Sequence, residues 1–245
     1  MSATWYCCRQ RAGPLVKECR ALRPRFGKED TAQDHAAKST IKKYERTAVN
    51  RKAVDRLELA LALFGRSGWM HTLTFDGDHI PQNFKGVRTQ LTAFFRGSKR
   101  WRESLNKPPG FRYIYAIEGL HGDRRYHVHL ISDEYELSPA EVQYLWKRGF
   151  VDSEPVLLKK GGYRRLAEYL NKERTDGFVI PIGRHPWSCS RSLTAQMPAP
   201  EKWKSDSGVI EVPDNAVWVR RDSIENDFGA YYFASWILPE SRATD

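Results

Sequence analysis

The order of strand-like and helix-like segments in the middle of this 245-residue chain is the feature that most limits its fold. Alternating apolar and polar residues, with many β-branched and aromatic side chains, predict strands at three places: residues 69–75, 111–117 and 126–131. Apolar residues at helical spacing, a capping box and composition predict helices at three more: residues 87–95, 138–149 and 163–172. A further extended segment begins at Phe150. This order predicts an α+β fold in which helices flank a central, mostly antiparallel sheet.

A basic segment precedes this region. The whole chain has 40 Lys and Arg against 30 Asp and Glu, a formal net charge of +10, and residues 1–56 alone contain 14 basic and 6 acidic side chains. Gly and Pro interrupt the first half of that segment, whereas residues 39–64 have a composition compatible with a helix. The positive charge favours a polyanionic partner. Two interpretations of the segment stay open: an arm that holds nucleic acid, and an ordinary solvated helix with a frayed tail.

We expect three parts in the chain. Residues 1–65 form a basic N-terminal arm and helix, residues 66–195 the α+β domain, and residues 196–245 a C-terminal extension that completes or covers the sheet. The sequence has no run of about 18 apolar residues and no signal peptide, so we expect a cytoplasmic protein. The four cysteines lack CxxC spacing, and we expect them to be reduced thiols without a function.

Two histidines on one predicted strand are the first candidates for chemistry. His127 and His129 are two residues apart, so their side chains point from the same face, about 6.6 Å apart along the strand. Glu118, near the end of the preceding strand, can lie opposite the pair and supply an oxygen. Two imidazoles and a carboxylate can hold a divalent ion and leave positions open for a substrate. The alternative is a pair of exposed or hydrogen-bonded histidines, because an HxH pattern alone is not specific.

A tyrosine on the last predicted helix is the second candidate. Tyr169 and Lys172 are three residues apart and therefore neighbours on one helix face, with Glu173 also close. A phenol beside a metal-bound phosphate can act as a nucleophile, and an adjacent ammonium can balance phosphate charge. Tyr163 lies about 120° round the helix and is a poor second nucleophile. The alternative is a tyrosine packed into a core or an interface.

Taken in order, these segments resemble the three motifs of HUH endonucleases. The matching residues are Thr72 to Phe75, then Glu118 with Tyr126 to Ile131, then Ala167 to Glu173. The sequence is most similar to the single-tyrosine rolling-circle replication initiators of bacterial plasmids and phages, over roughly residues 45–195. Residues 187–193 also resemble a segment that follows the tyrosine helix in some of these proteins.

The resemblance implies an HUH, ferredoxin-like nuclease domain and a role for each candidate. His127, His129 and Glu118 would bind Mg or Mn, Tyr169 would be the nucleophile, and Lys172 the basic residue one turn on. Such a protein nicks and rejoins single-stranded DNA at an origin or origin hairpin through a 5′-phosphotyrosine, and frees a 3′-OH primer. A host polymerase would extend the primer, and a host helicase would separate the strands, because the sequence has no P-loop motif. The location implied is the cytoplasm of a bacterial host cell.

Basic residues outside these motifs are candidates for contacts with DNA. Four of them flank two glycines at a helix start and two lie in the loop before the histidine strand: Lys159, Lys160, Arg164, Arg165, Arg124 and Arg125. Trp101 and Tyr126 are candidates for stacking on bases. A further basic cluster ends the first predicted helix: Arg96, Lys99, Arg100 and Arg102. Solvated surface charge is the alternative for each of them.

Other functions stay open at this point. A relaxase or a transposase would share the chemistry, although relaxases usually carry a further metal-binding histidine, for which the loop residue His121 fits poorly. A non-catalytic basic DNA-binding protein would explain the charge, but it would not require Glu118, the two histidines and Tyr169 together. A histidine-triad hydrolase ranks last, because residue 131, where a third alternating histidine would stand, is Ile.

Overall fold

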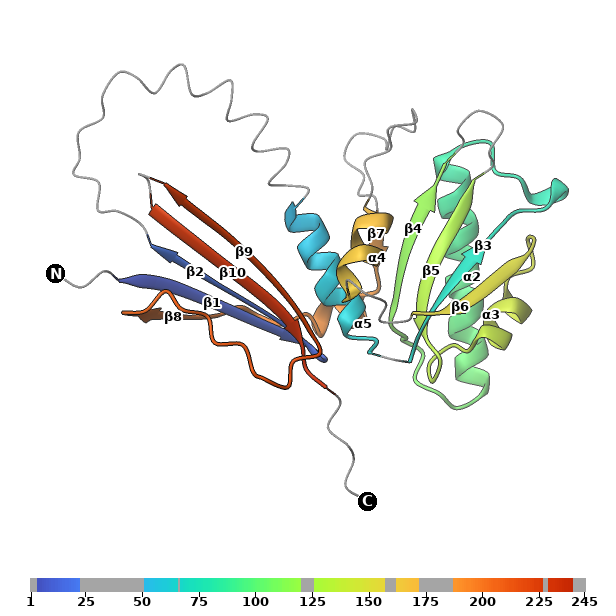
Figure 1. Ribbon diagram of the computed structural model, residues 1–245. Coiled ribbons are helices and arrows are strands. Elements are labelled where there is room, and N and C mark those ends of the chain that lie inside the picture. Colours follow the sequence, from blue (N-terminus) through green and yellow to red (C-terminus); the bar gives the residue numbers. More distant parts are fainter. Residues whose placement is uncertain are drawn as a thin grey trace, which may run out of the picture. The chain divides into compact units, whose positions relative to one another are not determined.

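The computed structural model describes residues 4–22, 51–65, 67–119, 126–156, 162–171, 187–226 and 229–239. The described residues contain two antiparallel five-stranded sheets together with helices, which confirms the predicted α+β class. The chain divides into two compact units (Figure 1). The first unit comprises residues 1–62, 160–164 and 197–245, and the second comprises residues 63–159 and 165–196. None of the helices in the described ranges has the length and hydrophobicity that a bilayer crossing requires.

The sheet of the second unit contains the segments that carry the sequence motifs. Its strand order is β6-β3-β5-β4-β7, and every neighbouring pair is antiparallel. The strands are β3 (Gly68–Leu73), β4 (Tyr113–Glu118), β5 (His127–Asp133), β6 (Val151–Pro155) and β7 (Trp187–Cys189). The helices are the short 3-10 helix η1 (Gly77–His79), then α2 (Phe84–Ser104), α3 (Pro139–Leu145), α4 (Gly162–Leu170) and α5 (Arg191–Ala195). The predicted hairpin of the second and third strands is confirmed as β4 and β5.

One face of this sheet carries a large apolar core. Val128 and Leu130 of β5 are fully buried, and they alternate with the two histidines on the opposite face. Side chains from α2 and α3 complete the cluster: Leu73, Phe75, Val87, Leu91, Phe94, Phe111, Ile117, Leu137, Val142 and Trp146. The alternation of β5 therefore assigns one face to stability and leaves the other for His127 and His129.

Helix α3 begins as its sequence predicts. The Ser138 side chain accepts a hydrogen bond from the Glu141 N–H, and the Glu141 carboxylate accepts one from the Ser138 N–H, so the capping box is confirmed. The helix ends at Leu145, one turn before the predicted end near Gly149. The following residues instead pack against the chain after β3, where the Trp146 indole donates to the Thr74 carbonyl. Gly149 has a φ of +151°, and a Cβ there would lie 2.4 Å from the same carbonyl oxygen.

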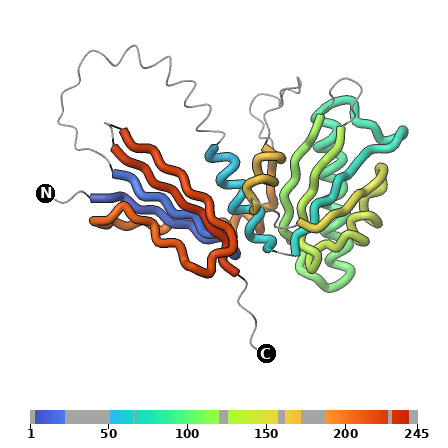
Figure 2. The backbone as a smooth tube through the Cα atoms, viewed as in Figure 1, coloured from blue at the N-terminus to red at the C-terminus, as the bar shows by residue number. Residues whose placement is uncertain are grey.

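The sheet of the first unit joins the two ends of the chain. Its order is β8-β1-β2-β10-β9, and Figure 2 shows the N-terminal strands beside the C-terminal ones. The strands are β1 (Trp5–Ala12), β2 (Leu15–Leu22), β8 (Glu201–Ser205), β9 (Trp218–Asn226) and β10 (Gly229–Ile237). Residues 51–62, which lie in the predicted helical segment, are helical.

This sheet differs from two expectations. Residues 5–22 form a hairpin that turns at Gly13 and Pro14, with Gly13 at a φ of +51°, whereas the sequence predicted a frayed basic tail. The described C-terminal strands pair with that hairpin and with one another, so they do not complete the sheet that carries the histidines. The physical reason is the same for both, because each strand finds its partner at the far end of the chain.

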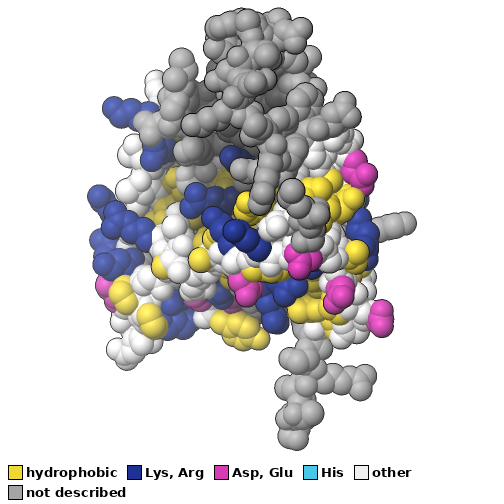
Figure 3. Space-filling view, turned by 90° about the vertical axis from the view of Figure 1, so that its left-hand side faces the viewer, with side chains coloured by type: hydrophobic (Ala, Val, Ile, Leu, Met, Phe, Trp, Pro, Cys, Tyr) yellow, Lys and Arg dark blue, Asp and Glu magenta, His cyan; other side chains and the backbone are white. Residues whose placement is uncertain are grey.

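Several N-terminal charges are neutralised within the first unit. Arg9 and Arg20 both pair with the buried carboxylate of Glu18, at 2.6 and 2.9 Å. The Lys17 ammonium lies 2.6 Å from a carboxylate oxygen of Glu58, which is also buried. Lys and Arg side chains are nevertheless spread over the side of the molecule shown in Figure 3, with acidic and hydrophobic side chains between them. The segment expected to act as a basic arm is thus partly a structural element whose charges are paired.

A buried histidine in β3 makes the stability of the second unit dependent on pH. His71 lies between the hydroxyls of Ser153 and Ser132, at 2.8 and 2.9 Å, and its burial lowers its pKa from 6.5 to about 4. Between these values the unfolded chain binds a proton that the native state does not. Stability should therefore fall as the pH drops from about 6.5 to about 4, by about 3 kcal/mol in all. Urea unfolding of wild type and His71→Gln at pH 7 and pH 4.5 tests this: the variant should lose less stability on acidification, and an identical loss would contradict it.

Candidate active site

The register of the β4–β5 hairpin brings Glu118 opposite His127. The two residues are cross-strand partners, and Ala116 is the partner of His129. Because cross-strand partners share a face, Glu118, His127 and His129 all project from the face opposite to the apolar core. The pairing of two adjacent strands is thus sufficient to gather a carboxylate and two imidazoles.

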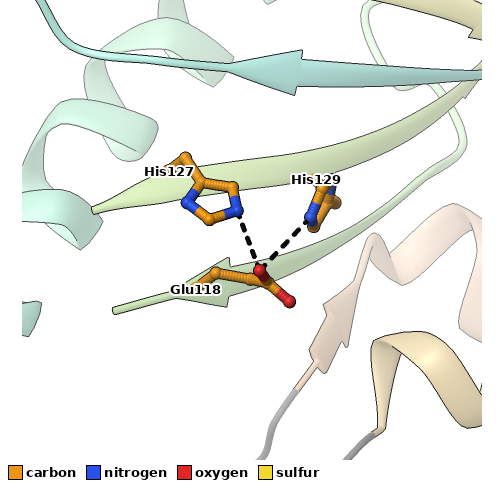
Figure 4. Close-up of side chains that lie close together, drawn as sticks. All are labelled: Glu118, His127 and His129. Atoms are coloured by element: carbon orange, nitrogen blue, oxygen red, sulfur yellow. Dashed lines mark ion pairs between the residues drawn. The ribbon is translucent and has the colours of Figure 1, made fainter. Parts of the chain in front are cut away.

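The three side chains converge on one point (Figure 4). An oxygen of Glu118 lies 2.8 Å from Nε2 of His127 and 3.7 Å from Nε2 of His129. The ligand atoms that the three residues offer all lie within 4.8 Å of one another. The site is partly enclosed, since the side chains of His129, Glu118 and His127 are 6%, 17% and 27% exposed.

A threonine of β3 holds the ring of His129. Thr72 is the cross-strand partner of His129, and its Oγ1 lies 3.3 Å from Nδ1 of the imidazole. If Nδ1 carries the proton and donates it to Thr72, Nε2 presents its lone pair to the side of Glu118. This is the tautomer that an imidazole needs in order to bind a metal through Nε2.

Tyr169 reaches the same histidine from helix α4. Its hydroxyl lies 3.4 Å from Nε2 of His129, and the two rings meet edge to face with centroids 5.5 Å apart. Within the helix, Ala167 and Leu170 are buried while Tyr169 remains 45% exposed. The phenol is therefore beside the His-His-Glu group and still open to a large substrate.

The donor set fits a divalent ion. Ligands at about 2.1 Å from a common ion are roughly 3 to 4 Å from one another, and the separations of 2.8 and 3.7 Å lie close to that range. Two neutral nitrogens and one carboxylate leave coordination positions for oxygens of a substrate. The group can thus hold a metal ion and present it to the tyrosine.

The other predicted site residues are placed as follows. Those outside the described residues are Lys172, Glu173, Lys159, Lys160, Arg124, Arg125 and His121. Arg164 is engaged by acidic groups of the first unit, with Asp55 at 2.5 Å and Glu58 at 3.6 Å. Arg165 is exposed on α4, and Tyr163 is buried, as suits a tyrosine that is not a second nucleophile.

Comparison with known proteins gives a result for the same segment. Residues 68–174 match the family model of the replication-associated protein ORF2. The HUH resemblance is confirmed there. The Rep segment, as we call residues 68–174, contains Glu118, both histidines and Tyr169, and it is shorter than the range of 45–195 expected from the sequence. No curated protein and no solved structure matches the chain.

Sequence reasoning missed the part played by Thr72. The residue stands in the first of the three motifs of the Rep segment, but the motif alone assigned it no function. Its position follows from the register that pairs β3 with β5, which sets Thr72 directly opposite His129. A polar residue on the histidine face of the neighbouring strand was the signal that could have identified it.

Proposed function

We propose that the chain is a replication initiator that nicks and rejoins single-stranded DNA at an origin through a covalent bond between Tyr169 and a 5′ phosphate. The observation that carries the proposal is the 3.4 Å separation between the Tyr169 hydroxyl and Nε2 of His129, a residue of the His-His-Glu group. The match of the Rep segment to a family of replication-associated proteins supports the same function, with rolling-circle replication as its context.

The His-His-Glu group would hold the cofactor, for which we propose Mg or Mn. Bound there, a divalent ion polarises a phosphodiester and offsets the charge that builds on its oxygens. Glu118 contributes the negative charge of the site, and Thr72 keeps His129 in the required orientation.

Tyr169 would carry out the transfer. Its phenolic oxygen forms a bond to phosphorus while the bond between phosphorus and the 3′ oxygen breaks, in line with the attack. The phenol loses its proton to water, and the departing 3′ oxygen gains one. In the reverse direction a 3′ hydroxyl attacks the phosphotyrosine and restores the DNA strand, so the stored bond makes ATP unnecessary. Nicking and joining would then share one site.

Partners follow from this chemistry. The free 3′ hydroxyl would prime a host polymerase, a host helicase would separate the strands, and both steps would take place in the cytoplasm of a bacterial host. A relaxase or a transposase would use the same residues on a different DNA, and preference for an origin hairpin over transposon ends separates them. A DNA-binding protein without activity would not need the convergence of Glu118, His127 and His129.

Basic residues near the helix that bears Tyr169 would hold the DNA. We propose that Lys172 balances the charge of the attacked phosphate and that the remaining cations contact the backbone on either side: Lys159, Lys160, Arg164, Arg165, Arg124 and Arg125. Arg165 is exposed, as this role requires, whereas Arg164 would have to exchange its pairs with Asp55 and Glu58 for phosphate.

The direct test is a covalent adduct with labelled single-stranded DNA from the replicon that encodes the chain. Incubation with Mn should give a protein–DNA band that survives denaturation, and EDTA should prevent it. A band that persists in EDTA would contradict the metal-dependent mechanism. Failure of every origin strand to form a band in Mn would contradict the proposed function.

The role of Thr72 gives a separate prediction. Thr72→Val keeps the shape of the side chain but removes the partner of Nδ1 of His129. Loss of a hydrogen bond that orients a ligand typically weakens metal affinity at least about tenfold, so the Mn concentration for half-maximal adduct formation should rise by that factor. Thr89→Val is the matched control, because Thr89 is exposed on α2 and donates only to the Lys85 carbonyl of its own helix. Equal Mn requirements in the two variants would contradict the role of Thr72.

A further inference from the structure

A basic and aromatic groove lies on the face of the sheet opposite to the His-His-Glu group. It has a volume of about 310 Å³ and is formed between α2 and β4. Residues at odd positions of β4 line it, whereas Glu118 projects from the other face. We call it the α2 groove and define it by six residues: Arg88, Phe95, Arg96, Lys99, Tyr113 and Tyr115.

The floor of the α2 groove is a set of rings held in place by one another. Phe95 stacks on Tyr113, with centroids 4.0 Å apart and an angle of 11° between the planes. Tyr115 lies 5.7 Å from Phe95 and 6.3 Å from Tyr113. All three rings are half-buried, so part of the ring surface stays accessible. Burial, with smaller contributions from Tyr115 and Cys189, raises the pKa of Tyr113 to about 12, so its hydroxyl remains protonated at neutral pH.

The wall of the α2 groove is cationic. Arg88, Arg96 and Lys99 are exposed on one side of α2, at spacings that place them on the same helix face. Lys99 has Glu103 at 3.8 Å, an exposed pair that solvent screens. Within the described part of the chain, Arg88 and Arg96 form no ion pair, and no residue that lines the groove is acidic. The groove therefore has positive charge available for an anion.

We propose that the α2 groove binds one nucleotide of single-stranded DNA, its base against the aromatic floor and its phosphate against the cationic wall. Aromatic rings beside Arg and Lys are the chemistry that recognises single strands, because any base can stack and any phosphate is anionic. A duplex offers no free base face to the rings. The volume is at the small end of ligand pockets and suits one nucleotide. The identity of the ligand rests on the proposed function, which makes single-stranded DNA the substrate.

The position of the α2 groove decides which nucleotide it takes. Tyr113 and Tyr115 project from one face of β4 and Glu118 from the other, so the nucleotide in the groove is not the one attacked by Tyr169. The groove binds DNA that flanks the nick. It would contribute to affinity for a long strand, and it would hold the strand after cleavage without contacting the reacting phosphate.

Binding of fluorescein-labelled dT30 by the full chain in EDTA tests the cationic wall. Arg96→Glu and Arg100→Glu make the same change of charge one turn apart on α2, and only Arg96 lines the groove. By anisotropy, Arg96→Glu should weaken binding at least about fivefold more than Arg100→Glu. It should also reduce the slope of log K against log salt by about 0.7, the value for one phosphate contact to a single strand. Equal losses in the two variants would reflect the general field of the protein and would overturn the proposal.

A second comparison tests the aromatic floor. Tyr115→Leu keeps apolar volume but removes a ring on which a base can stack. It should weaken binding of dT30 at least about fivefold and leave binding of an abasic strand of the same length unchanged. An equal effect on both strands, or no effect on dT30, would overturn the stacking role.

These results separate the α2 groove from the proposed nuclease, because binding is measured without metal and adduct formation with it. If wild type forms the Mn-dependent adduct but Arg96→Glu and Arg100→Glu bind alike, the groove alone is wrong. If Arg96→Glu binds more weakly than Arg100→Glu but no adduct forms, the nuclease is wrong and the groove remains a site for single strands.

Discussion

Replacing Tyr169 by Phe should abolish the covalent adduct, by a factor of at least about 10⁴, because loss of a nucleophile removes the reaction itself. The change deletes one hydroxyl from a side chain that is 45% exposed. Stability should therefore stay within about 0.5 kcal/mol of wild type. The measurement is the yield of adduct with a labelled origin strand in Mn, together with thermal unfolding of the same preparations.

Tyr144→Phe is the control for this variant. Tyr144 is also an exposed tyrosine on a helix, at 58% exposure, but it contacts Trp101 and not the His-His-Glu group. It should form the adduct at the rate of wild type. If Tyr169→Phe formed the adduct as well, another side chain would be the nucleophile.

Replacing His129 by Ala should have the second largest effect. His129 is 6% exposed and is the one residue of the site that contacts Glu118, Thr72 and Tyr169 together. Disturbing a residue that only orients a ligand costs about 10 to 100-fold, so loss of His129 itself should lower the adduct yield by more than about 100-fold. Binding of single-stranded DNA in EDTA should change by less than about twofold, because that binding depends on Lys and Arg.

His79→Ala is the control for the histidine variant. His79 is 44% exposed and pairs with Asp76, so its loss removes an imidazole from outside the site. It should leave adduct formation at the level of wild type. Undiminished cleavage by His129→Ala would contradict the metal site, and an equal loss of DNA binding in EDTA would indicate that the variant does not fold.

Local patterns predicted the second unit well. The capping box of Ser138 and Glu141 and the strands around the histidines depend on neighbours in sequence, and each is found where expected. The N-terminal hairpin could not be predicted in the same way. Its strand β1 lies between β2 and β8, and Trp5 pairs with Ser205, two hundred residues further along the chain.

The distribution of charge misled the interpretation of the N-terminal segment for a related reason. Arg9, Lys17 and Arg20 add to the basic count of residues 1–56, which suggested an arm for DNA. In the structure they pair with Glu18 and Glu58, of which Glu58 lies outside that count. A count of charges does not reveal which of them are neutralised by partners, so the basic α2 groove received less weight than the arm.

The candidate site was predictable in part. The spacing of His127 and His129 and the position of Glu118 at the end of the previous strand follow from the hairpin pattern, and the structure brings the three together. The approach of Tyr169 to His129 depends on how α4 packs, which no local pattern specifies. The HUH resemblance supplied that link before the geometry did.

The measurement that tests the central claim most directly is the location of the DNA on the protein. The adduct formed in Mn should be digested with protease and nuclease and the modified peptide sequenced by mass spectrometry. We predict a nucleotide joined through its 5′ phosphate to Tyr169, and no such peptide from reactions in EDTA. A nucleotide attached to any other residue, or the same peptide in EDTA, would contradict the account.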